Sequence, residues 1–200
     1  MKLIMFLFTF YVAVTIVGCA SLPCLEKRLL SENDSIMGRA RAELDNTWNT
    51  QKLVDLSQNL IPKAKYGNQR QSLMAFQALA SMYVSGDYFG LRGYSVVGVA
   101  ATPFTEMIGK QRTLIQQLDD KCIDNYLLAI DNGNPETKIF CIDILSQAQP
   151  IYTKTVDHLI KILNSDWENP SYHAYWALKK IGTLQALEAT AQYDQVYKKQ

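Results

Sequence analysis

The sequence predicts an all-α protein built from stacked helical hairpins, either as a short solenoid or as an irregular helical bundle. Apolar residues recur at helical spacing in successive blocks along most of the chain. Proline and glycine stand where those blocks would begin and end. Residues 95–101 form the only β-like run of the sequence, and a glycine interrupts that run.

The chain divides into an export signal at residues 1–18, a short tether at residues 19–34 and a helical domain at residues 35–200. In the signal, Lys2 is followed by a run of fifteen residues that is apolar apart from two threonines. A basic residue, a short apolar core and a small residue before the cleavage point are typical of an export signal. A membrane-spanning helix needs roughly 20 apolar residues, so this run is marginal for a span.

The segment Ile16-Val17-Gly18-Cys19 resembles the lipobox of bacterial lipoproteins. The resemblance implies that the signal is cut after Gly18 and that Cys19 becomes the lipid-bearing first residue of the mature chain. Two or three acyl chains hold a protein on a membrane far more firmly than one chain does. Ala20 stands where Asp would imply retention in the inner membrane, so we expect the periplasmic face of the outer membrane in a Gram-negative host. An uncleaved membrane anchor and a plain secretory signal are the alternatives.

Three helices are expected in the first half of the domain. Polar residues at 32–35 can cap a first helix over residues 36–48. A second helix covers residues 50–61 and is stopped by Pro62, and a third covers about residues 68–84.

A longer helix is expected to follow. Thr102 and Pro103 have the pattern of an N-cap and a first helical residue. The apolar pattern then reaches about residue 131, with an interruption near Gly109.

The last third of the chain has the clearest helical pattern. Asn-Pro pairs at 134–135 and 169–170 each open a helix, and Gly182 follows the second one. The expected helices are those over residues 135–148, 153–163, 170–181 and 184–197.

The two Asn-Pro pairs lie 35 residues apart, a period that belongs to stacked helical hairpins. Residues 134–190 resemble HEAT repeats of the short, HEAT-like kind, although Asn replaces the Asp of that family at both starts. The basic position of the family falls on Lys138 and on His173, for which we expect a hydrogen bond to a neighbouring loop. The apolar stripe falls on Phe140, Cys141, Ile144 and Leu145. This resemblance implies stacked hairpins and protein partners.

The charge balance argues against a nucleic-acid partner. The 20 basic and 19 acidic residues nearly cancel, and the basic residues are scattered rather than clustered. Removing residues 1–18 leaves 182 of the 200 residues, which is enough for one domain with its own core.

We expect neither an enzyme active site nor a metal site, and no cofactor besides the covalent lipid on Cys19. The two histidines, His158 and His173, have no ligands at metal-binding spacing. Cys122 and Cys141 flank a turn in apolar helical stripes, where they would form either a disulfide or two buried, reduced thiols.

Residues 85–101 form the most unusual segment, since four of the ten glycines fall between residues 86 and 98. The segment exceeds the usual connection between two helices. Its aromatic residues either close the end of the core or form a recognition surface. The candidate surface residues are Tyr88, Phe89, Arg92 and Tyr94.

These patterns predict a lipid-anchored envelope protein that acts as a protein-binding adaptor or assembly factor. Its partners would be the membrane, through the lipid, and another protein. One alternative is an envelope enzyme that uses residues 85–101 as an active-site loop. Another is a factor that excludes phage or conjugation machinery.

Overall fold

The computed structural model describes residues 21–45, 50–86, 113–166 and 168–197. Regular structure in these ranges is helical, apart from an isolated bridge between Gln117 and Gln149. The prediction of an all-α fold is therefore confirmed for the described part of the chain. The helices are α2 (Leu22–Leu29), α3 (Asp34–Asp45), α4 (Thr50–Tyr66), α5 (Gln69–Gly86), α7 (Ile123–Asn132), α8 (Pro135–Leu145), α9 (Thr153–Leu163), α10 (Glu168–Ile181) and α11 (Leu184–Tyr197).

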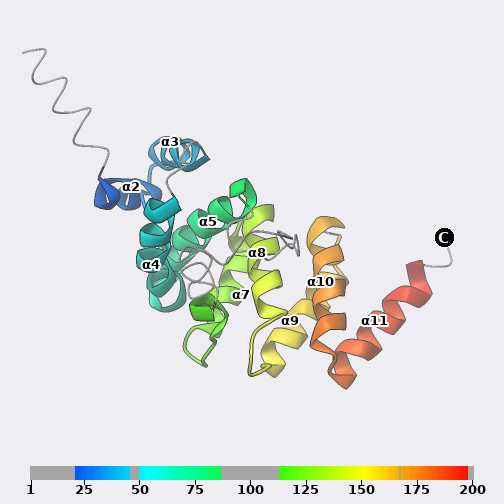
Figure 1. The fold of residues 1–200 in the computed structure, drawn as a ribbon. Coiled ribbons are helices and arrows are strands. Elements are labelled where there is room, and N and C mark those ends of the chain that lie inside the picture. The colour runs from blue at the N-terminus through cyan, green and yellow to red at the C-terminus, as the bar shows by residue number, and fades with distance from the viewer. Residues whose placement is uncertain (1–20, 46–49, 87–112, 167, 198–200) are drawn as a thin grey trace, which may run out of the picture.

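The helices stack in two rows (Figure 1). One row contains α3, α5, α8 and α10, and each of these helices packs on the one before it. The other row contains α2, α4, α7, α9 and α11. Helices that follow one another along the chain pack across the two rows, as α4 does with α5 and α9 with α10. The stack therefore runs from α2 at one end to α10 and α11 at the other.

Helix α2 lies inside the segment that was expected to be a tether. Leu25 and Leu29 are fully buried in the common core. Glu26 forms an ion pair with Lys63 of α4. The expectation of a tether up to residue 34 is thus wrong, because leucines one helical turn apart give this short segment an apolar face to bury.

Helix α4 does not stop at Pro62 but continues for four further residues, to Tyr66. Proline removes one helical hydrogen bond and crowds the preceding turn. The turn after Pro62 is nevertheless packed, since Ala64 is fully buried. Asn125 of α7 also donates hydrogen bonds of 2.9 and 3.1 Å to the carbonyls of Lys65 and Gly67. These tertiary contacts outweigh the local penalty of the proline.

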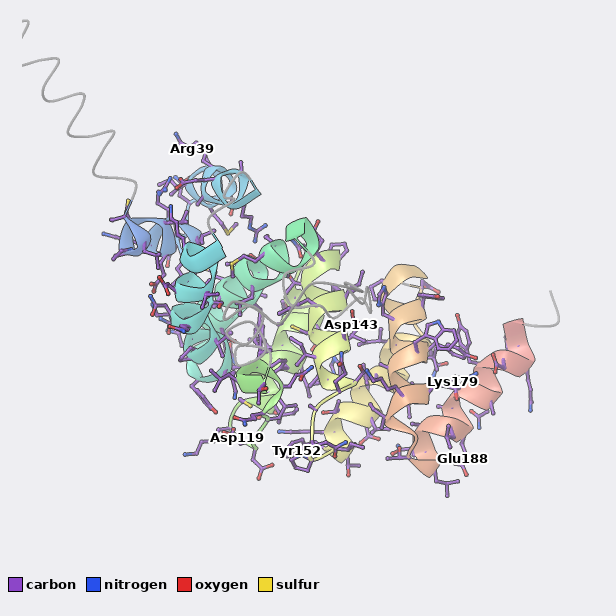
Figure 2. The ribbon with its side chains drawn as sticks, viewed as in Figure 1. Arg39, Asp119, Asp143, Tyr152, Lys179 and Glu188 are labelled. Carbon is purple, nitrogen blue, oxygen red and sulfur yellow. The ribbon has the colours of Figure 1, made fainter. Side chains whose placement is uncertain are left out.

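The long helix predicted up to residue 131 is broken. Residues 113–116 are helical, the chain then turns, and α7 starts only at Ile123. Asp119, labelled in Figure 2, accepts hydrogen bonds through Oδ1 from the backbone N–H groups of Lys121 and Cys122. The carboxylate thus accepts hydrogen bonds from backbone N–H groups that would otherwise pair with helical carbonyls. This interrupts the helix, and a new helix begins just after these residues. The expected interruption at Gly109, like Thr102 and Pro103, lies outside the described residues.

In the last third of the chain, the residues predicted to begin and end helices are largely confirmed. The side chain of Asn134 accepts a hydrogen bond of 2.8 Å from the N–H of Thr137, as an N-cap does. Gly182 ends α10 with a φ of 68°, in the left-handed region that glycine tolerates. Helix α10 begins at Glu168, slightly earlier than the Asn-Pro pair implied.

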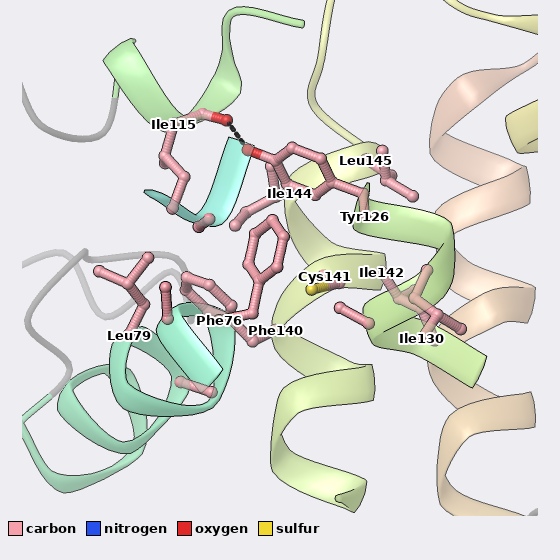
Figure 3. Close-up of a cluster of buried hydrophobic side chains, with 14 of the residues drawn as sticks. Phe76, Leu79, Ile115, Tyr126, Ile130, Phe140, Cys141, Ile142, Ile144 and Leu145 are labelled. Carbon is pink, nitrogen blue, oxygen red and sulfur yellow. Dashed lines mark hydrogen bonds between the residues drawn. The ribbon is translucent and has the colours of Figure 1, made fainter. Parts of the chain in front are cut away.

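The core lies between the two rows (Figure 3). The rings of Phe76 on α5 and Tyr126 on α7 pack with centroids 4.6 Å apart. The hydroxyl of Tyr126 donates a hydrogen bond to the carbonyl of Ile115, so this buried polar group has a partner. Phe140 and Cys141 of α8 are fully buried in the same cluster.

Candidate binding surface

Two of the cysteines, on either side of the turn before α8, are buried thiols rather than a bridge. Cys122 and Cys141 are both unbridged and inaccessible. Burial raises the pKa of the Cys141 thiol well above its usual range, and burial also raises the pKa of Cys122. A thiol must ionise to act as a nucleophile. Of the two alternatives, the structure contains the buried, reduced thiols.

Each histidine faces an aspartate of the preceding helix in its own row. His158 Nε2 of α9 lies 2.9 Å from Oδ1 of Asp131, beside the end of α7. His173 Nδ1 of α10 lies 3.3 Å from Oδ1 of Asp143 on α8. His173 thus contacts a helix, not the loop that was expected. Within the described residues, no group of three or more His, Cys, Asp or Glu side chains could hold a metal ion.

Lys138, at the predicted basic position, closes the end of α7. Its ammonium group donates hydrogen bonds of 2.8 Å to the carbonyls of Ile130 and of Asp131. Partial burial lowers the pKa of Lys138, while the carboxylate of Asp131 opposes that shift. The lysine satisfies carbonyls that a helix end leaves without partners.

The predicted recognition residues Tyr88, Phe89, Arg92 and Tyr94 lie outside the described residues, and so do Gly18 and Cys19. Lipid attachment therefore stays an expectation from the sequence. Among the described residues, no helix combines the length and the apolar character that crossing a membrane requires.

An exposed aromatic cluster lies instead at the end of the stack, on α10. Tyr172 and Trp176 are 60% and 53% exposed. Their rings meet edge to face with centroids 6.3 Å apart, and Tyr175 meets Trp176 at 5.3 Å. We call this surface the end face, and it consists of Tyr172, Tyr175, Trp176 and Lys179 of α10 together with Tyr193 and Asp194 of α11.

A lysine and an aspartate hold the end face together. Figure 2 shows Lys179 on the side of α10 that is turned away from α8. Its Nζ lies 4.5 Å from the ring centroid of Tyr175 and 5.8 Å from that of Trp176. Cation–π contacts of this kind stabilise both the charge and the ring positions.

Asp194 balances the charge of that lysine. Its Oδ1 accepts a hydrogen bond of 2.8 Å from the hydroxyl of Tyr175. Its Oδ2 lies 3.5 Å from Nζ of Lys179. A hydrogen bond between Lys179 itself and Tyr175, together with the negative charge of Asp194, raises the pKa of Lys179. The end face therefore carries one cation and one anion that already pair with each other.

Exposed large hydrophobic side chains are concentrated on the last two helices. Among the described residues, five of the eight exposed large hydrophobic side chains belong to α10 and α11. They are Tyr172, Trp176, Leu184, Leu187 and Val196. Of these five, Tyr172 and Trp176 contact each other. Contiguous exposed apolar surface is typical of interaction sites, whereas isolated exposed hydrophobic residues are not informative.

Sequence reasoning missed this cluster although a signal was present. Residues 172–176 contain three aromatic residues at positions that share one side of a helix. Such a stripe normally predicts a buried face. In the structure the buried face of α10 is already occupied by Ala174, Ala177 and Leu178, so the larger aromatic rings remain outside.

The sequence matches no protein-family model and no curated protein.

Proposed function

We propose that this chain is a lipid-anchored protein of the cell envelope, attached through Cys19, that acts as a protein-binding adaptor or assembly factor. The observation that carries the binding role is the exposed, ordered aromatic cluster of the end face. Tyr and Trp are enriched in the residues that dominate binding energy at protein interfaces.

The ring positions support a preformed binding surface. Tyr175 is fixed by its hydrogen bond to Asp194 and by its contact with Tyr193, whose ring centroid lies 5.7 Å away. Trp176 packs against Tyr175. Side chains that are already held in place lose little conformational entropy when a partner binds. The cluster can therefore contribute to affinity without first becoming ordered.

The position of the face suits an anchored protein. Helix α2, which follows Cys19 in the sequence, lies at the opposite end of the stack from α10 and α11 (Figure 1). A lipid on Cys19 would hold the α2 end near the membrane. The end face would then remain accessible to a partner.

Photo-crosslinking in living cells tests the binding role. A benzophenone amino acid placed at Trp176 is expected to give a discrete covalent adduct after irradiation. The same group at Gln58, which is exposed on α4, is the control and is expected to give no adduct. A probe at Tyr88 tests the glycine-rich segment in parallel. An adduct from neither Trp176 nor Tyr88 would contradict the proposed function.

A further inference from the structure

We draw no further inference here: the strongest candidate, the pocket of about 230 Å³ between the turn that follows α2 and the first turns of α5, carries nothing because its two charged side chains, Glu32 and Arg70, already pair with each other at 3.1 Å and nothing in the described part of the chain shows what would fill it.

Discussion

The hydroxyl of Tyr66 donates a hydrogen bond of 2.8 Å to Oδ2 of Asp119. This contact joins the last residue of α4 to the turn that precedes α7. Beside it, the buried Nζ of Lys65 donates hydrogen bonds of 3.1 and 2.5 Å to the carbonyls of Leu114 and Gln117. The end of α4 therefore holds residues 113–122 in position, which explains why the helix persists beyond Pro62.

The Tyr66–Asp119 hydrogen bond predicts a pH-dependent stability. Desolvation, together with the hydrogen bond and charge of Asp119, raises the pKa of Tyr66 from 10.0 to about 12. A raised pKa stabilises the fold below pH 10.0, and this contribution is lost as the pH rises to about 12. The same bond is the main cause that lowers the pKa of Asp119 below 3.8. That contribution is present above pH 3.8 and is lost as the pH falls through the lowered value.

Tyr66→Phe should consequently be less stable than the wild type at neutral pH, and the difference should shrink at both extremes. Denaturant unfolding at a series of pH values measures it. Tyr172→Phe, which removes a hydroxyl from an exposed ring of α10, is the control and should show no such profile. A difference between Tyr66→Phe and the wild type that does not vary with pH would show that the hydrogen bond does not control these two pKa values.

Lys138→Met should destabilise the protein by about 1–2 kcal/mol, because the carbonyls at the end of α7 lose a charged hydrogen-bond donor. Methionine keeps most of the side-chain length, so the change mainly removes the ammonium group. The free energy of unfolding in urea measures the effect. Lys161→Met, at an exposed position of α9, should change it by less than about 0.5 kcal/mol. Equal effects of the two variants would argue against a capping role for Lys138.

Two glycines should respond to alanine in opposite directions. Gly182 has a φ of 68°, so Gly182→Ala should cost about 1 kcal/mol through backbone strain, although the nearest atoms are 3.9 Å from the new methyl group. Gly38 lies inside α3 with open space around it, and Gly38→Ala should stabilise the protein by about 0.5–1 kcal/mol. Thermal unfolding of both variants provides the test, and a stabilising Gly182→Ala would contradict the assigned helix end.

These cases show which features of the fold the sequence can predict. Asn134 caps α8 with its own side chain, and Gly182 ends α10 through its own φ angle, so both helix ends can be predicted from a few neighbouring residues. Pro62 was misjudged because the contacts that offset it come from α7, far along the chain. The end face was missed for a related reason. Periodicity tells which side of α10 is apolar, but the exposure of Trp176 depends on which helices pack nearby.

Pro62→Ala should stabilise α4 by about 1–3 kcal/mol, since alanine restores the missing helical hydrogen bond and removes the steric conflict at an exposed position. Pro135 is the matched control because it is the first residue of α8, where no helical hydrogen bond is lost. Pro135→Ala should change the free energy of unfolding by less than about 0.5 kcal/mol. Urea unfolding measures both, and a loss of stability in Pro62→Ala would mean that the proline favours the local structure of α4.

Cys19→Ala tests the anchor on which the proposed function depends. Labelled fatty acid supplied to growing cells should enter the wild-type protein and should be absent from Cys19→Ala, because the thiol is the expected site of acylation. Cys24→Ala is the matched control. Cys24 lies five residues further along the chain, within α2, and its replacement should leave the label in place. Label retained in Cys19→Ala but lost in Cys24→Ala would move the attachment site onto α2. Label retained in both variants would contradict the proposal that this protein is a lipoprotein.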